Sequence, residues 1–206
     1  NYSVNSVLNK VRPLPPRVDF SFNVGYGWLP KTEGLTGTDK QFDDKLTSGL
    51  AWDLAFHHYI KNFGWGIFYS GYSSDSYYEK TNMDHNVLLS YIAPLFCTKY
   101  SFNKKWMING EVGVGYLKFS DKISSGIEKG KTYVSTVGFN YGIGIEYKLN
   151  KHMGIGISFN EIVGSAFLKN IKMENVHSII AYNDYDRINL NRLNLLGGIR
   201  FYFGDR

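Results

Sequence analysis

The stretch VGFNYGIGIEYKL, residues 137–149, alternates between two kinds of residue. One set is apolar or aromatic, whereas the other consists of Gly138, Asn140, Gly142, Gly144, Glu146 and Lys148. Successive side chains of a β-strand point to opposite faces, so the alternation predicts a strand between two environments. Glycine weakens a strand interior and therefore indicates a crowded face. A narrow closed barrel with an apolar outside has such an interior, and a barrel of this kind belongs in a membrane.

The same alternation recurs in six further segments, which are residues 17–28, 48–59, 63–73, 106–119, 153–162 and 188–203. An eighth segment, 85–100, is apolar almost throughout and contains Pro94. Proline cannot donate to a ladder, so we expect a strand with a bulge near Pro94. Eight is an even number of strands, as in single-chain bacterial barrels.

The connections between these segments alternate in length. Short links lie around 60–62, 101–105 and 150–151, and long ones span 29–46, 74–84, 120–131 and 163–187. Tight periplasmic turns and long outer loops are typical of a membrane barrel. The sequence thus predicts an all-β, eight-stranded, antiparallel up-and-down transmembrane barrel over 17–203. An N-terminal periplasmic arm, 1–16, precedes it and a tail, 204–206, follows, with both termini in the periplasm.

Composition excludes several other classes of protein. No apolar run approaches the length of a membrane helix, whereas a strand spans with about 9 to 11 residues, half of them apolar. This fits a mean hydropathy of −0.26. The single cysteine, Cys97, excludes an internal disulfide and a cysteine-based metal site. The net charge of +5 is spread over loops, so we expect no nucleic-acid partner. We expect no cofactor.

Aromatic residues gather near both ends of the predicted strands. Trp and Tyr favour membrane interfaces, which predicts two lipid-facing girdles. The predicted girdle residues are Trp28, Tyr59, Phe63, Trp65, Trp106, Tyr147, Phe201 and Phe203.

With these features the chain resembles the small eight-stranded outer-membrane barrels of Gram-negative bacteria, typified by OmpX and the membrane half of OmpA. The alternating strands, the turn and loop asymmetry and the closing LLGGIRFYF, residues 195–203, carry the resemblance. Phe203 is similar to the terminal aromatic that the barrel-assembly machinery reads, although the tail 204–206 departs from that pattern. The Tyr- and Asn-rich strands also look like barrels of Bacteroidetes-type bacteria. The resemblance implies an outer-membrane location in the cell envelope.

The predicted lumen holds four acids and one arginine, namely Asp19, Asp53, Glu111, Glu146 and Arg200. Unpaired buried charges are costly, so these residues should form an ion-pair network that plugs the tube. Arg200 closes against the first strand, and we expect it to pair with Asp19 and Glu146. A proton or ion path is the alternative role for this network.

The outer rim carries six lysines that could contact lipopolysaccharide phosphates, namely Lys118, Lys122, Lys129, Lys131, Lys169 and Lys172. Other envelope proteins could bind the loop 163–187 or the arm 1–16. The His and Ser pair of small-barrel deacylases, two residues apart on one strand, is absent from the sequence, and the sequence assigns no serine constellation to His85 or His177. We therefore expect a non-enzymatic structural, surface-interaction or accessory subunit. The alternatives are a narrow-pore or small-solute barrel and a soluble lipocalin-like lipid-binding barrel.

Overall fold

The structure is a computed structural model that describes residues 14–29, 48–78, 83–125, 128–167, 172–174 and 187–204. The described chain forms ten strands, which are β1 (Val18–Trp28), β2 (Ser48–Ile60), β3 (Phe63–Tyr78), β4 (Met83–Ser101), β5 (Trp106–Ser125), β6 (Glu128–Lys148), β7 (Met153–Phe167), β8 (Lys172–Glu174), β9 (Arg187–Asn189) and β10 (Arg192–Phe203). Among these described segments there is no helix long and apolar enough to cross a membrane.

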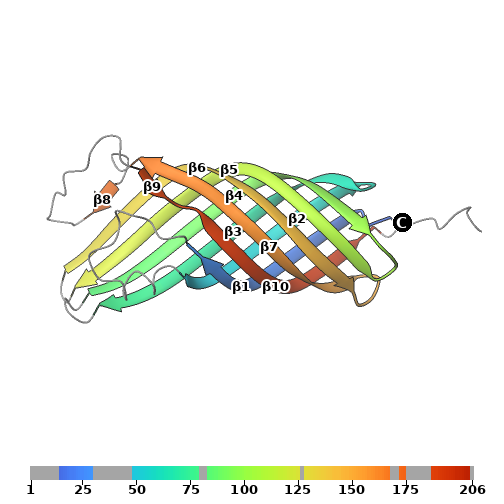
Figure 1. The fold of residues 1–206 in the computed structure, drawn as a ribbon, viewed down its shortest axis with the longest axis horizontal. Coiled ribbons are helices and arrows are strands. Elements are labelled where there is room, and N and C mark those ends of the chain that lie inside the picture. Colours follow the sequence, from blue (N-terminus) through green and yellow to red (C-terminus); the bar gives the residue numbers. More distant parts are fainter. Residues whose placement is uncertain are drawn as a thin grey trace, which may run out of the picture.

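Eight of the strands, β1 to β7 and β10, close into the barrel of Figure 1. Each pairs antiparallel with its neighbours, and β1 closes the ring against β10. Following paired residues once around the ring leads from Val137 to Tyr147 on the same strand, a stagger of ten residues (147 − 137). With strands ~4.8 Å apart and ~3.3 Å per residue, this stagger tilts the strands by about 40° from the barrel axis.

The apolar faces of the strands point outward. On β6, the side chains of Val137, Phe139, Tyr141, Ile143 and Ile145 are between 42% and 70% exposed, whereas Asn140 and Glu146 are buried. An exposed apolar band around a closed barrel is what the hydrocarbon of a membrane requires. The predicted transmembrane barrel is therefore confirmed, and the lipocalin-like alternative would need these apolar rows inside.

The inward glycines leave room for large polar side chains. A Cβ added to Gly154 would lie 2.4 Å from Tyr202 Oη, and one added to Gly144 would lie 2.5 Å from Asn109 Oδ1. At Gly156 an added Cβ would lie 3.1 Å from Arg200 Nη2. The glycine-rich face thus reflects a crowded lumen, as the alternation in residues 137–149 predicted.

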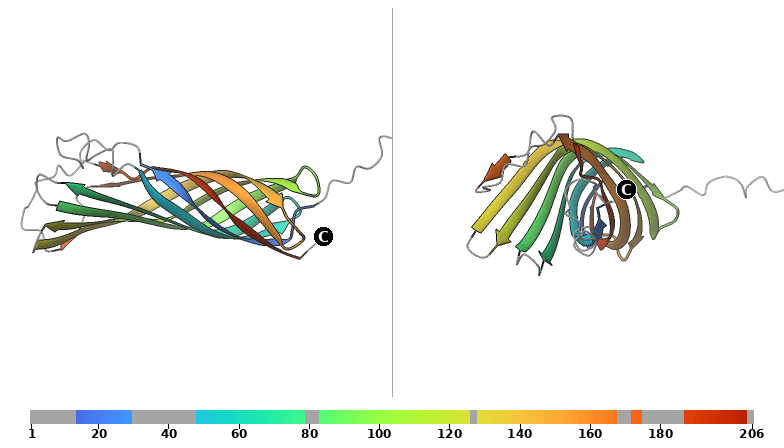
Figure 2. Two further views of the ribbon diagram at one scale, coloured as in Figure 1. Left: turned by 90° about the horizontal axis from the view of Figure 1, so that it is seen from below. Right: turned by 60° about the vertical axis from the view of Figure 1, so that its left-hand side comes forward.

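Two of the predicted long loops are mostly strand. The predicted loop 74–84 contains the ends of β3 and β4, and the predicted loop 120–131 contains the ends of β5 and β6. The polar residues read as loop instead occupy strand positions beyond the apolar band. Strands β3 to β6 consequently extend past β1 and β10 at the end opposite the C-terminus, as Figures 1 and 2 show. We call this extension, residues 73–78, 83–90, 117–125 and 128–136, the outer wall.

The bulge predicted near Pro94 is wrong. The β3–β4 ladder keeps one register from Phe63↔Thr98 to Tyr78↔Met83. The β4–β5 ladder omits Ala93 and Pro94 and resumes in the same register at Leu95↔Gly113. The missing proline donor therefore interrupts the ladder without adding a residue. The long apolar run arises because β4 is apolar on both faces, with Leu89, Tyr91, Ala93, Leu95 and Cys97 buried inside.

Three other predicted segments are only partly described. The predicted loop 163–187 contributes residues 163–167 to β7, the three residues of β8 and the first residue of β9. Its remaining residues, most of the predicted loop 29–46 and residues 1–13 of the arm lie outside the described residues.

Candidate functional site

The half of the lumen nearer the short turns holds a buried network of charged side chains from five strands. Lys99 Nζ lies 2.9 Å from Glu146 Oε2 and also donates to Asp19. Asp19 Oδ1 lies 2.7 Å from His57 Nδ1, and Arg200 Nε lies 3.3 Å from Glu146 Oε1. Each of these five residues is no more than 3% exposed. The network therefore joins strands on opposite sides of the barrel.

The predicted partners of the acids are only partly right. Arg200 pairs with Glu146 as predicted, but Asp19 pairs with Lys99 and His57 instead of Arg200. Arg200 Nη1 donates to the side-chain oxygen of Asn23. Sequence reasoning missed Lys99 because the inward phase of the apolar segment 85–100 was not assigned. Counting in steps of two from the buried Tyr91 would have placed Lys99 inside.

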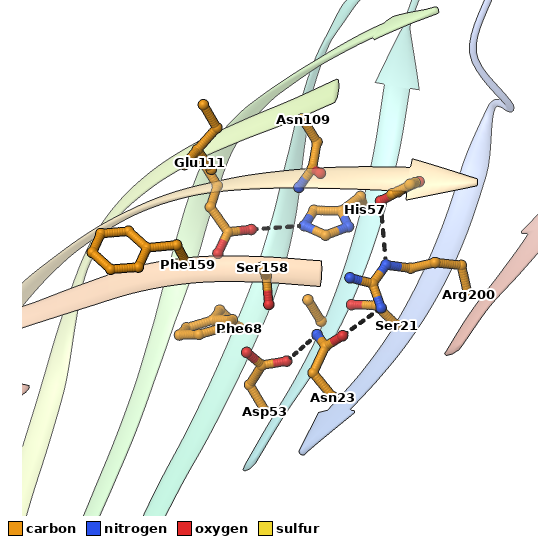
Figure 3. A pocket seen from close by; sticks show the side chains of 13 residues that line it. Ser21, Asn23, Asp53, His57, Phe68, Asn109, Glu111, Ser158, Phe159 and Arg200 are labelled. Carbon is orange, nitrogen blue, oxygen red and sulfur yellow. Dashed lines mark hydrogen bonds and ion pairs between the residues drawn. The ribbon is translucent and has the colours of Figure 1, made fainter. Parts of the chain in front are cut away.

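Asp53 and Glu111 contact polar groups other than arginine or lysine. Asp53 accepts hydrogen bonds from Asn23 and, at 3.2 Å, from Asn160 Nδ2. Glu111 Oε2 lies 3.2 Å from His57 Nε2. Figure 3 shows Asn23, Asp53, His57 and Glu111 around a cavity. The volume of this cavity is about 20 Å³. A cavity of this size has room for about one water molecule.

The other half of the lumen contains a large apolar cluster, which the sequence analysis did not predict. Phe68, Leu89, Tyr91, Leu117 and Ile162 are no more than 1% exposed and belong to one apolar cluster. At the edge of the cluster, the Tyr91 hydroxyl donates a hydrogen bond of 2.9 Å to Asn140 Oδ1. Side chains of the cluster pack beside the charged network, so, contrary to the expectation from the sequence, ion pairs alone do not plug the tube.

Arg192 is a second buried cation that sequence reasoning missed. It is 1% exposed, its Nη2 donates to Ser70 Oγ, and its guanidinium lies 5.7 Å from the centroid of the Tyr72 ring. Its phase is that of Asn194 and Arg200 on the same strand, so the alternation of β10 could have found it.

Most predicted girdle residues lie on the outer face. Exposed residues among them are Trp28, Phe63, Trp65, Trp106 and Phe203, and those half-buried are Tyr147 and Phe201. Trp106 and Tyr147 meet edge to face with ring centroids 4.9 Å apart. Tyr59 does not belong to the girdle. It shares the inward phase of His57, is 0% exposed, and carries the Lys99 ammonium 5.2 Å from its ring centroid.

Three of the predicted outer lysines lie on the outward face of the outer wall. Lys118 and Lys122 of β5 are exposed, and Lys131 of β6 is half-buried. Lys122 and Lys131 are direct partners in the β5–β6 ladder. Lys129 and Lys172 lie in β6 and β8, and Lys169 lies outside the described residues.

Candidate metal and catalytic groups are few. In the part of the chain that the structure describes, no group of three His, Cys, Asp or Glu side chains is placed to hold a metal ion. His85 lies in β4, and His177 lies outside the described residues. Cys97 is a buried free thiol in the lumen.

Comparison with known proteins identifies the architecture. No family model and no curated protein matches the sequence. Among solved structures, the Neisserial surface protein A, NspA, superposes with a TM-score of 0.57 at 10% identity, covering 90% of this chain and 97% of that one. The outer membrane protein OprG from Pseudomonas aeruginosa superposes with a TM-score of 0.52 at 14% identity, covering 92% and 98%. The protein therefore has the fold of the small eight-stranded outer-membrane β-barrels.

Proposed function

We propose that this protein is a non-catalytic barrel of the bacterial outer membrane that acts as a structural or surface-interaction subunit. In this proposal the short turns and both termini face the periplasm. The outer wall lies on the extracellular side of the membrane and contacts lipopolysaccharide. The loop 163–187 or the arm 1–16 binds other envelope proteins. The lumen is a solid core that braces the barrel.

The filled lumen is the observation that carries the proposal. A charged network and an apolar cluster occupy successive parts of the tube, and the cavity beside Asp53, Glu111 and Arg200 has a volume of about 20 Å³. Eight strands enclose a space just wide enough for side chains. A tube filled in this way supports a structural role over the alternative of a narrow pore.

Conductance across planar lipid bilayers tests this role. The full chain should insert and give no unitary current steps, while a known porin in the same bilayers gives them. Insertion is verified by recovering folded protein from the same bilayer lipid. Regular current steps that depend on this protein would overturn the structural role and favour the narrow-pore alternative.

The lysines of the outer wall support contact with lipopolysaccharide. Lys122 and Lys131 oppose each other directly in the ladder, and like charges in that arrangement destabilise a sheet. Lys118 lies on the same face of β5 as Lys122. On that face Asp75 accepts a hydrogen bond from Asn86, and Glu174 of β8 is the ladder partner of Lys131 on the side away from Lys122. An anionic phosphate between the two lysines would remove their repulsion.

Binding of purified lipid A to the protein in phosphatidylcholine nanodiscs tests the lysines. The triple variant K118Q/K122Q/K131Q should bind lipid A about tenfold more weakly, because it loses charge-assisted hydrogen bonds to phosphate. The matched control is K104Q/K105Q/K151Q, which removes three exposed lysines from the opposite rim. Equal affinities of the two triple variants would remove the support for lipopolysaccharide contact.

A further inference from the structure

The wall of the barrel divides between β6 and β7 near its outer end. The β6–β7 ladder runs from Lys148↔Gly154 to Gly138↔Gly164 and stops there. Beyond that pair, β6 continues against β8 at Tyr133↔Lys172. On β7 only the opposite edge stays paired, where β9 follows β10 in the same register from Arg192↔Ile162 to Ser165↔Asn189. Among the described residues, positions 134–137 of β6 therefore have no ladder partner on the β7 side. We call this opening the β6–β7 split.

A groove lies along the split. Its volume is about 530 Å³, within the range of small-molecule sites, and its apolar lining includes the outward Val114, Val137, Phe139 and Val163, together with the buried Ile188 of the lumen cluster. Val137, the first residue of β6 beyond the end of the β6–β7 ladder, is 70% exposed. The split is spanned by a hydrogen bond of 2.8 Å from Thr136 Oγ1 to the carbonyl oxygen of Ser165.

The groove sits at the outer boundary of the apolar band. On β6 the outward residues are apolar from Ile145 to Val137, and the next outward residue is Ser135. On β7 the outward Val163 is followed by Ser165. Unpaired backbone groups are tolerated at this level only where a polar partner reaches them, because hydrocarbon offers none.

The end of the groove beyond Gly164 is polar and positively charged. Arg187 lines it, is exposed, and stacks on the Phe167 ring with its guanidinium carbon 4.2 Å from the ring centroid. The nearest acid on the outward face of β7, Glu161, accepts a hydrogen bond from the Tyr141 hydroxyl. The groove therefore combines an apolar floor with a cation held at its outer end.

We propose that the β6–β7 split binds one acyl chain of lipid A, with the chain in the groove and a phosphate at Arg187. This inference rests on the proposed function, since it places the protein among lipopolysaccharide molecules. It adds a specific site to the general attraction of the outer-wall lysines. An apolar groove with a fixed guanidinium at the headgroup level matches an amphiphile that carries a phosphate.

The test compares two probes, intact lipid A and its fully deacylated phosphorylated headgroup, on the full chain in phosphatidylcholine nanodiscs. V137W fills the groove with a bulky side chain, and I145W adds the same side chain to the same face of β6 outside the groove. R187Q removes the cation, and R17Q removes an exposed arginine at the opposite rim. Folding of each variant is verified by its β-sheet circular dichroism, and V114W replaces V137W if V137W does not fold.

We expect V137W to weaken the binding of intact lipid A about tenfold and to leave the binding of the headgroup probe unchanged, because only the acyl chain is displaced. R187Q should weaken the binding of both probes, whereas I145W and R17Q should change the affinity for neither probe. Lipid A affinity that is equal in V137W and I145W would overturn the groove as an acyl-chain site. If the lysine triple variant still weakens lipid A in that case, the proposed function stands and only this inference fails.

Discussion

Lys99 Nζ lies 2.9 Å from Glu146 Oε2, although β4 and β6 are not neighbours in the barrel. The lysine reaches across the lumen and holds Asp19 on its other side. Strands that share no ladder are thus joined by one ammonium group. Two buried carboxylates depend on this cation for part of their neutralisation, and the cation is 0% exposed.

Replacing Lys99 with methionine should destabilise the barrel strongly. The K99M variant keeps the volume but leaves Asp19 and Glu146 with less positive charge, and breaking a buried pair in this way costs about 3–5 kcal/mol. Urea unfolding of the protein in lipid vesicles measures the loss. K104M, which removes an exposed lysine at the turn rim, should change the free energy of unfolding by less than about 0.5 kcal/mol.

The double variant K99M/D19N provides the control for this interpretation. It removes the negative charge of Asp19 together with the lysine, while Glu146 keeps Arg200 and His57 keeps Glu111, so part of the lost stability should return. A K99M protein as stable as the wild type would contradict the assignment of Lys99 as the central cation.

Two glycines on opposite faces should respond differently to alanine. A Cβ at the inward Gly156 would lie 2.8 Å from the Ile145 carbonyl oxygen, whereas at the outward Gly197 the nearest atom would be 4.0 Å away. G156A should therefore cost about 1–3 kcal/mol by overpacking, and G197A should be tolerated. The measurement is the urea midpoint in vesicles, and equal midpoints for the two variants would show that the lumen is not crowded at Gly156.

The faces of the strands could be predicted from the sequence because alternation directly encodes which side chains point inward. Val137 and Asn140 were assigned to the correct faces by that rule alone. The ends of strands in the outer wall were predicted poorly. Polar residues such as Lys122 continue a strand beyond the apolar band as readily as they form a loop. Alternation reports the environment of a side chain and not the end of the ladder.

Most contacts inside the lumen could not be predicted from the sequence. They depend on the stagger of ten residues, which decides which inward side chains reach one level of the barrel. The pairing of Arg200 with Glu146 could be anticipated from their similar depth. The pairing of Asp19 with Lys99 could not, because the continuous apolar run around Pro94 hides the phase of β4.

Two phenylalanines of β3 should differ in their contribution to stability. Phe68 is 1% exposed within the apolar cluster, whereas Phe63 is 61% exposed on the outer face. F68A should cost about 3–5 kcal/mol because it leaves a cavity in the lumen. F63A should cost much less, because lipid chains fill the space that the ring vacates. Unfolding in vesicles compares the two, and a larger loss for F63A would contradict the packed outer half of the lumen.

Tryptophan fluorescence in vesicles with brominated lipids should report the depth of each face. In variants with one tryptophan each, Trp106 should be quenched most by bromines near the headgroup. I143W, at an outward position that is 53% exposed, should be quenched most by bromines near the middle of the chain. F68W, at the buried position in the lumen, should be quenched least because bromine acts at short range.

The contrast between I143W and F68W tests the orientation of the whole barrel. Both substitutions place one indole in a strand, so differences in quenching arise from the face that each strand position presents. Insertion into vesicles is verified by showing that the folded protein resists a urea concentration at which the chain without vesicles stays unfolded. Quenching of F68W together with protection of I143W would mean that the apolar rows face inward, and the transmembrane assignment would then be wrong.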